Sequence, residues 1–97
     1  MTELEHLFAC LSEECGEVIQ EVSKIHRFGI ADSNPRIDNV VPNEERLSNE
    51  INDLMGVVEM LKERGVKIEL SATKMLEKKA KVERYMEYAR EKGTLNP

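Results

Sequence analysis

The sequence is poor in aromatic residues and in cysteine. Its 97 residues include no Trp, two Phe, two Tyr and two Cys, although 40% of the chain is hydrophobic. The aliphatic residues recur at helical spacing and do not alternate with polar ones, which excludes paired strands and predicts an all-α protein. A chain of this length builds one modest core, so we expect a single domain over 1–97 that associates with other protomers.

The scarcity of cysteine excludes a disulfide framework and a cysteine-rich metal site. Cys10 and Cys15 lie on one predicted helix and point in different directions, so they cannot pair with each other. A zinc site would need more Cys or His nearby. We therefore expect two buried free thiols.

Basic clusters and long apolar runs are also missing. The net charge is -5 and the basic residues are interspersed, which argues against a nucleic-acid surface. No apolar run approaches the ~20 residues of a membrane span, and the first residues lack the basic and then apolar order of a signal peptide. We expect a cytoplasmic protein that binds neither nucleic acid nor membrane.

Three amphipathic segments are predicted to be helices. The first begins at Thr2, in a pattern typical of a capping box, and runs to Phe28. The second has Asn43 as its cap and ends at 62–64, before a glycine. The third spans about 67–92, and its first turn is open to interpretation as a separate short helix. Together they predict an antiparallel bundle of three to four helices, completed by association of protomers. The residues of the third helix expected to face inward are Ile68, Ala72, Met75, Leu76, Val82, Met86 and Ala89.

The connection at 30–42 holds two prolines and several turn-forming residues, and it is long for a link between helices. Segments of this kind are lids or binding loops in some proteins. The competing interpretation is a mobile connector. We see no domain boundary in it.

The glycines divide into two groups. Gly29, Gly65 and Gly93 each follow a basic last turn, as C-terminal caps do. Gly16 and Gly56 lie inside predicted helices, where Gly costs ~1 kcal/mol relative to Ala. Close helix approach or room for a ligand would explain both.

Two pairs of acids lie beside or within the apolar stripes. Glu14 and Glu17 follow one edge of the stripe on the first helix, and Glu21 continues that edge. On the second helix, Glu50 falls inside the apolar arc and Asp53 follows one turn later. A buried carboxylate needs a cation, hydrogen bonds or a proton, and repulsion from a second acid makes a bare site worse.

A divalent cation resolves this conflict. Mg²⁺ or Mn²⁺ takes carboxylate oxygens, and four acids suit more than one ion. The competing interpretation of the first pair is a solvated face, which is common in a chain that is 34% charged. The second pair favours metal because it intrudes on an apolar stripe.

Two other kinds of catalytic site find no support. A di-iron bundle requires two Glu-x-x-His motifs on different helices, and only Glu3 and His6 form one. Neither histidine sits in a recognisable setting for a Ser-His-Asp triad. The acids therefore remain the candidate site.

These residues resemble a known signature. Glu13-Glu14-Cys15-Gly16-Glu17 followed by Glu50-Ile51-Asn52-Asp53 is similar to the EExxE…ExxD motif of MazG-type enzymes, within the all-α nucleoside triphosphate pyrophosphohydrolase superfamily. The similarity extends over about residues 1–92. The compact single-domain form is similar to phage and prophage members.

The resemblance implies roles for particular residues. Glu14, Glu17, Glu50 and Asp53 would be the Mg²⁺ ligands, and Glu13 would orient or deprotonate the attacking water. The reaction would be hydrolysis of a nucleoside triphosphate between the α and β phosphates, giving nucleoside monophosphate and pyrophosphate. The active site would lie among helices of a homodimer or homotetramer.

The phosphate contacts are less defined. Family members often carry basic residues on the third helix, where Lys78 and Lys79 are candidates. Lys24 and Arg27, near the acidic edge of the first helix, are equally good candidates. For each lysine the competing interpretation is a solvated surface.

Two other functions remain open at this point. One is hydrolysis of another phosphorylated nucleotide, such as a diphosphate or phosphoribosyl-ATP. The other is a non-catalytic helical dimerisation or adaptor module whose acids face solvent or a partner. The sequence does not identify the base.

Overall fold

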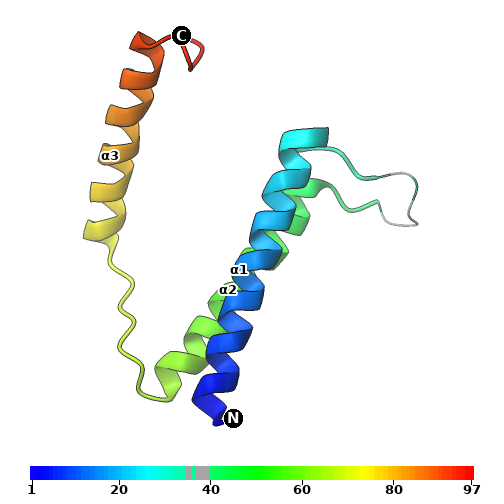
Figure 1. Cartoon of the computed structure of the whole chain (residues 1–97), viewed down its shortest axis with the longest axis vertical. Helices are drawn as coiled ribbons and strands as arrows, with labels where there is room; N and C mark the ends of the chain where they lie inside the picture. Colours follow the sequence, from blue (N-terminus) through cyan, green and yellow to red (C-terminus); the bar gives the residue numbers. More distant parts are fainter. Residues whose placement is uncertain (35, 37–39) are drawn as a thin grey trace.

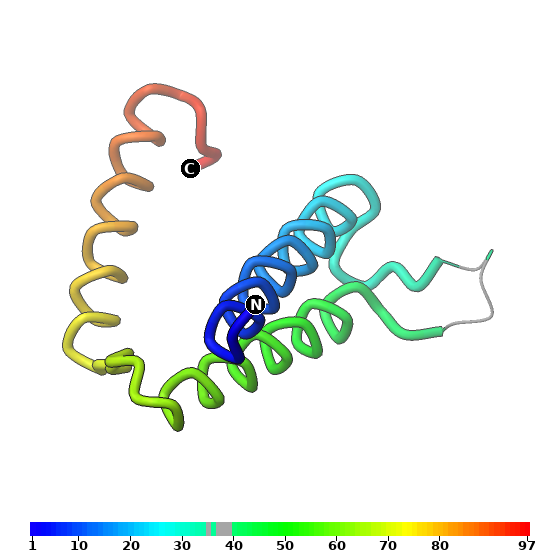
Figure 2. The backbone as a smooth tube through the Cα atoms, turned by 60° about the horizontal axis from the view of Figure 1, so that its bottom comes forward, coloured from blue at the N-terminus to red at the C-terminus, as the bar shows by residue number. Residues whose placement is uncertain are grey.

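The protein is all-α, as predicted. The computed structural model describes residues 1–34, 36 and 40–97, and every regular element within them is a helix. The helices are α1 (Glu3–Phe28), α2 (Asn43–Glu63) and α3 (Ala72–Glu91). α1 and α2 lie side by side and antiparallel, whereas α3 stands apart at the end of an extended connection (Figure 1; Figure 2).

Local capping sets the ends of α1. The Oγ1 atom of Thr2 accepts a hydrogen bond from the amide of Glu5 at 3.1 Å, so Thr2 caps the helix as predicted and Glu3 is the first helical residue. At the other end, Gly29 has φ +98° and donates its amide to the carbonyl of Ile25 at 2.8 Å. The predicted glycine cap is confirmed here.

Asn43 is not the N-cap of α2, so that prediction was wrong. Pro42 occupies the cap position without a side-chain hydrogen bond, and Asn43 is the first helical residue. Its Nδ2 atom donates to the carbonyl of Gly29 at 2.9 Å, and its amide donates to the carbonyl of Asp32 at 2.8 Å. The side chain is thus engaged in joining the start of α2 to the end of α1. Asn43 is buried for that reason.

The C-terminus of α2 follows the predicted glycine pattern. The amide of Gly65 donates to the carbonyl of Lys62 at 3.0 Å, and that of Val66 to the carbonyl of Leu61 at 3.1 Å. This pair of bonds is a Schellman motif, which needs a left-handed residue, and Gly65 has φ +88°. It holds Leu61, which is completely buried, at the end of the helix.

The prediction that the third helix begins near residue 67 was wrong. Residues 66–70 are not helical, either as part of α3 or as a short helix. α3 begins after Ser71, whose Oγ atom accepts a hydrogen bond from the amide of Lys74 at 3.2 Å. A hydroxyl that caps a helix satisfies an amide that would otherwise have no partner, so the helix starts there.

One chain does not bury the predicted bundle core. No Cα atom of α3 lies within 8 Å of α1 or α2. In the described part of the chain, only Leu7 and Leu61 are buried hydrophobic residues, and Met75 on the stripe of α3 is 50% exposed. The radius of gyration is 17.2 Å, against about 12–13 Å for a compact domain of this length. The stripe of α3 therefore does not face inward within a single chain.

The remaining expectations have mixed outcomes. Both cysteines are free, but Cys10 is half-buried and Cys15 is exposed, so the expectation of two buried thiols was wrong. α1 is covered on one side only, and Cys15 lies outside that side.

Part of the 30–42 loop, residues 35 and 37–39, lies outside the described residues. Its role as a lid or connector stays a prediction. Among the described residues, no helix has both the length and the apolar character to cross a membrane.

The two internal glycines are not explained by close packing in one chain. A Cβ atom built at Gly16 or at Gly56 would meet nothing within 4 Å. The prediction of close helix approach is therefore wrong within the chain, whereas room beside the acids is present.

Alanine substitutions at two glycines are expected to change stability in opposite directions. Gly65→Ala should lower the free energy of unfolding by ~1 kcal/mol or more, because φ +88° is strained for a residue with a Cβ. Gly56→Ala should raise it by up to ~1 kcal/mol, because this helical position has room for a methyl group. Urea unfolding measures both. A destabilised Gly56→Ala variant would contradict the open environment described here.

Candidate metal centre

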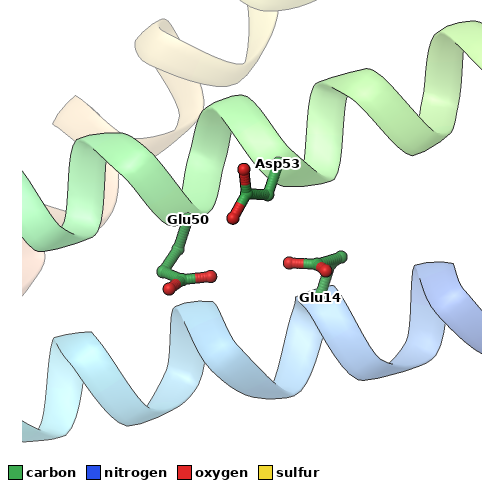
Figure 3. A group of neighbouring side chains, drawn as sticks. All are labelled: Glu14, Glu50 and Asp53. Atoms are coloured by element: carbon green, nitrogen blue, oxygen red, sulfur yellow. The ribbon is translucent and has the colours of Figure 1, made fainter.

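The antiparallel pairing of α1 and α2 brings acids from both helices together. Glu14 on α1 and Glu50 and Asp53 on α2 each offer one carboxylate oxygen, and these oxygens lie within 4.8 Å of one another. We call these three residues the acid cluster. Figure 3 shows their side chains pointing into the space between the two helices. One acid of the first predicted pair and both acids of the second, far apart in the sequence, therefore converge.

The acid cluster holds its charges without a basic partner. Among the described residues, no Lys, Arg or His nitrogen lies within 4.0 Å of its carboxylates. Burial first, and the charge of Asp53 second, raise the pKa of Glu14 and of Glu50 above the ordinary value of 4.5. The Oε2 atom of Glu14 is also buried, and no described residue offers it a hydrogen bond. A divalent cation would relieve both the repulsion and the missing contact.

Glu17 and Glu13 lie beside the acid cluster rather than in it. Glu17 is half-buried, and its charge contributes to raising the pKa of Glu50, but its oxygens are not part of the 4.8 Å group. Glu13 is exposed. The structure thus brings together three of the four predicted ligands and leaves the fourth nearby. The donors are all carboxylate oxygens, the set that Mg²⁺ and Mn²⁺ prefer.

Glu21 is a buried acid that was not among the predicted site residues. It is 5% exposed, and its Oε1 atom accepts a hydrogen bond from Nζ of Lys24 at 3.0 Å. Its Oε2 atom has no partner among the described residues. The sequence showed Glu21 on the same helix edge as Glu17. Its burial depends on how α2 covers α1, which helical spacing alone does not show.

Two of the four predicted basic residues belong to the same helix pair as the acids. Lys24 and Arg27 line a cavity of about 200 Å³ where α1 ends and α2 begins, and we call it the cationic pocket. Its lining residues are Lys24, Arg27, Phe28, Asp32, Asn34, Asn43 and Arg46. Lys78 and Lys79 are exposed on α3, which contacts neither helix of the pair, so one chain does not bring them to the acids.

Comparison with known proteins agrees with this geometry. Residues 2–86 match the family model described as the MazG nucleotide pyrophosphohydrolase domain. The matched region contains the whole acid cluster and the whole cationic pocket. No curated protein and no solved structure matches the chain significantly.

The raised pKa values predict how stability depends on pH when metal is removed. Between pH 4.5 and the raised pKa values, the folded protein binds more protons at Glu14 and Glu50 than the unfolded chain does. These two groups should therefore stabilise the fold as pH falls from neutral towards 4.5, and destabilise it as pH rises.

The measurement is chemical unfolding in chelator between pH 5 and pH 8, for the wild type and for Glu50→Gln. The variant loses one of the two titrating groups, so its free energy of unfolding should depend less steeply on pH. It should also exceed that of the wild type at neutral pH. Parallel pH profiles for the two proteins would contradict the repulsion within the acid cluster.

Proposed function

Because the chain belongs to the MazG nucleotide pyrophosphohydrolase family, we propose that it hydrolyses a nucleoside triphosphate between the α and β phosphates. The products are nucleoside monophosphate and pyrophosphate. The observation that carries the proposal is the convergence of Glu14, Glu50 and Asp53 into one group of oxygen ligands. Mg²⁺ is the proposed cofactor, and Mn²⁺ has the same donor preference.

The proposed metal ligands are Glu14, Glu17, Glu50 and Asp53. When bound, Mg²⁺ would supply positive charge that offsets the charge of the polyphosphate and of the departing pyrophosphate. This explains how a protein with net charge -5 binds an anionic substrate. The family match and the shared donor chemistry support the set, and the half-buried position of Glu17 beside the acid cluster supports its inclusion.

Glu13 is proposed to orient or deprotonate the attacking water. In this step the water oxygen forms a bond to the α-phosphorus, and the bond between that phosphorus and the oxygen bridging to the β phosphate breaks. The proton passes to the Glu13 carboxylate, and the bridging oxygen leaves with pyrophosphate. Glu13 is exposed and directly precedes Glu14, so it has access to solvent beside the acid cluster.

The proposed phosphate contacts divide between the two parts of the structure. Lys24 and Arg27 line the cationic pocket and belong to the same chain as the acid cluster. Lys78 and Lys79 lie on α3, which contacts neither α1 nor α2 of its own chain. They would reach an acid cluster only if α3 packs against the α1–α2 pair of another chain.

We also propose that the protein is a homodimer or homotetramer of a single domain over 1–97. Its thin core, with Leu7 and Leu61 the buried hydrophobic residues of the described part, supports association. The separate position of α3 supports it as well, because an amphipathic helix needs a surface for its apolar face. The cytoplasmic location stays a prediction.

Glu50→Gln is expected to reduce Mg²⁺-dependent pyrophosphate release by ~100-fold or more, because it removes a charged ligand from the acid cluster without changing its shape. It should also abolish the rise in melting temperature that Mg²⁺ produces in the wild type. Assays use a panel of canonical and modified nucleoside triphosphates, with product identification to separate other phosphorylated substrates.

The control variant is Glu59→Gln, an exposed acid on α2 that pairs with Lys62 at 3.4 Å, away from the acid cluster. It should keep both the activity and the response to Mg²⁺. Folded wild-type protein that releases no pyrophosphate across the panel would refute the proposed function.

Met75→Glu is expected to dissociate the assembly, although Met75 is 50% exposed in a single chain. The reason is that a charge on the apolar stripe of α3 cannot be buried against a partner. Tyr88→Glu is the control, since Tyr88 is similarly exposed and lies about 140° round the helix. Light scattering after size exclusion gives the mass of each. Equal masses for the wild type and Met75→Glu would contradict the use of this stripe in assembly.

A further inference from the structure

Arg46 was not a predicted site residue. Among the described residues, its guanidinium has a hydrogen-bond partner at Nε but none at Nη2. The Nε atom donates to the carbonyl of Val41 at 3.2 Å, which fixes the position of the group. The Nη2 atom is buried and has no hydrogen-bond partner among the described residues. A buried donor on a charged group is costly to leave unsatisfied, so this atom is available for a ligand.

Within the described residues, no acid pairs with this charge. No acid of the described residues lies within 4.0 Å of the Arg46 guanidinium. Glu21, a buried acid of α1, is paired with Lys24 at 3.0 Å instead. The cationic pocket that Arg46 lines also contains Lys24 and Arg27, and Asp32 is its one acid among the described lining residues. The pocket therefore has an excess of positive charge.

The cationic pocket and the acid cluster lie on the same side of α2. Arg46 precedes Glu50 by four residues, so the two side chains share a helix face about 6 Å apart along the axis. The backbone positions of Arg46 and Glu50 are therefore one helical turn apart, so the cationic pocket that Arg46 lines follows the acid cluster along α2. A substrate with several linked phosphates would extend from a metal at the acid cluster towards this pocket.

We propose that Arg46 binds a phosphate group of the substrate and that the cationic pocket is the phosphate subsite of the metal centre. A guanidinium suits this role because its planar N–H groups match two phosphate oxygens. The inference rests on the proposed function and adds a specific residue to it. The phosphate belongs either to the nucleoside monophosphate half of the substrate or to the pyrophosphate half.

The test measures binding of the two halves separately by calorimetry in the presence of Mg²⁺. The probes are pyrophosphate and ribose 5-phosphate, because neither depends on the identity of the base. Arg46→Gln should weaken binding of at least one probe by about tenfold to hundredfold. The probe that is affected identifies the half of the substrate that Arg46 contacts.

The control variant is Arg64→Gln at the opposite end of α2. Arg64 also donates to a backbone carbonyl, that of Met60 at 3.2 Å, and the two variants change the net charge equally. Arg64→Gln should leave both affinities within about twofold of the wild type. Arg46→Lys, which keeps the charge but not the planar group, should give a smaller loss than Arg46→Gln. It also serves as the test variant if Arg46→Gln does not fold.

Unchanged affinity of Arg46→Gln for both probes would overturn the inference, as would a wild type that binds neither. A lower melting temperature with unchanged affinities would show that Arg46 only holds the Val41 segment in place, which also overturns it. Pyrophosphate release by the wild type is measured separately. If the wild type is active and the Arg46 variants bind both probes normally, the inference fails and the proposed function stands. If the wild type is inactive but its phosphate affinity depends on Arg46, the proposed function fails and the inference stands.

Discussion

Repulsion among the carboxylates of Glu14, Glu50 and Asp53 is the constraint on which this structure depends. The packing of α1 on α2 places these acids within 4.8 Å of one another, so the same contact that forms the fold also concentrates negative charge. The pair is held at both of its ends. Asn43 binds the carbonyl of Gly29 at one end, and Arg64 lies 3.8 Å from Glu3 at the other. The acid cluster in the middle of the pair has no such contact, and a bound cation would stabilise it.

A change of charge along the α1–α2 pair follows from this arrangement. Acids occupy the middle of the pair, whereas Lys24, Arg27 and Arg46 gather where the two helices meet the connecting loop. Antiparallel pairing produces this order because the last turn of α1 lies beside the first turn of α2. The last turn of a helix favours basic side chains. This preference accounts for Arg27 in the last turn of α1 but not for Arg46, which lies in the first turn of α2, where the helix dipole does not favour a cation.

The sequence predicted the acid cluster but not its surroundings, and Glu50 shows why. A carboxylate inside an apolar arc contradicts helical periodicity, so the conflict is visible without a structure. Glu21 and Arg46 carry no such signal, because their burial arises only when the second helix and the loop cover them. Asn43 was placed correctly near a helix start but given the wrong role. The residue types that cap helices also form tertiary hydrogen bonds, and spacing does not distinguish the two.

The start of α3 shows a second limit of sequence reasoning. Apolar residues at helical spacing continue upstream of Ser71, yet the hydroxyl of Ser71 caps the helix and residues before it are extended. Periodicity therefore reported which residues share a face, but not where the backbone becomes helical. The glycine caps were predictable because left-handed backbone at Gly65 and Gly93 requires a residue without a Cβ.

The placement of the functional groups separates what one chain can do from what depends on assembly. The acid cluster and the cationic pocket are both built by α1, α2 and their connection, which pack together in a single chain. The proposed metal binding and the proposed phosphate contact through Arg46 therefore both depend on this pair. The lysines of α3 have no such fixed relation to the acids, and their contribution depends on the surface against which α3 packs. A variant that disturbs the pair should thus affect metal and phosphate together, whereas one that disturbs α3 acts through assembly.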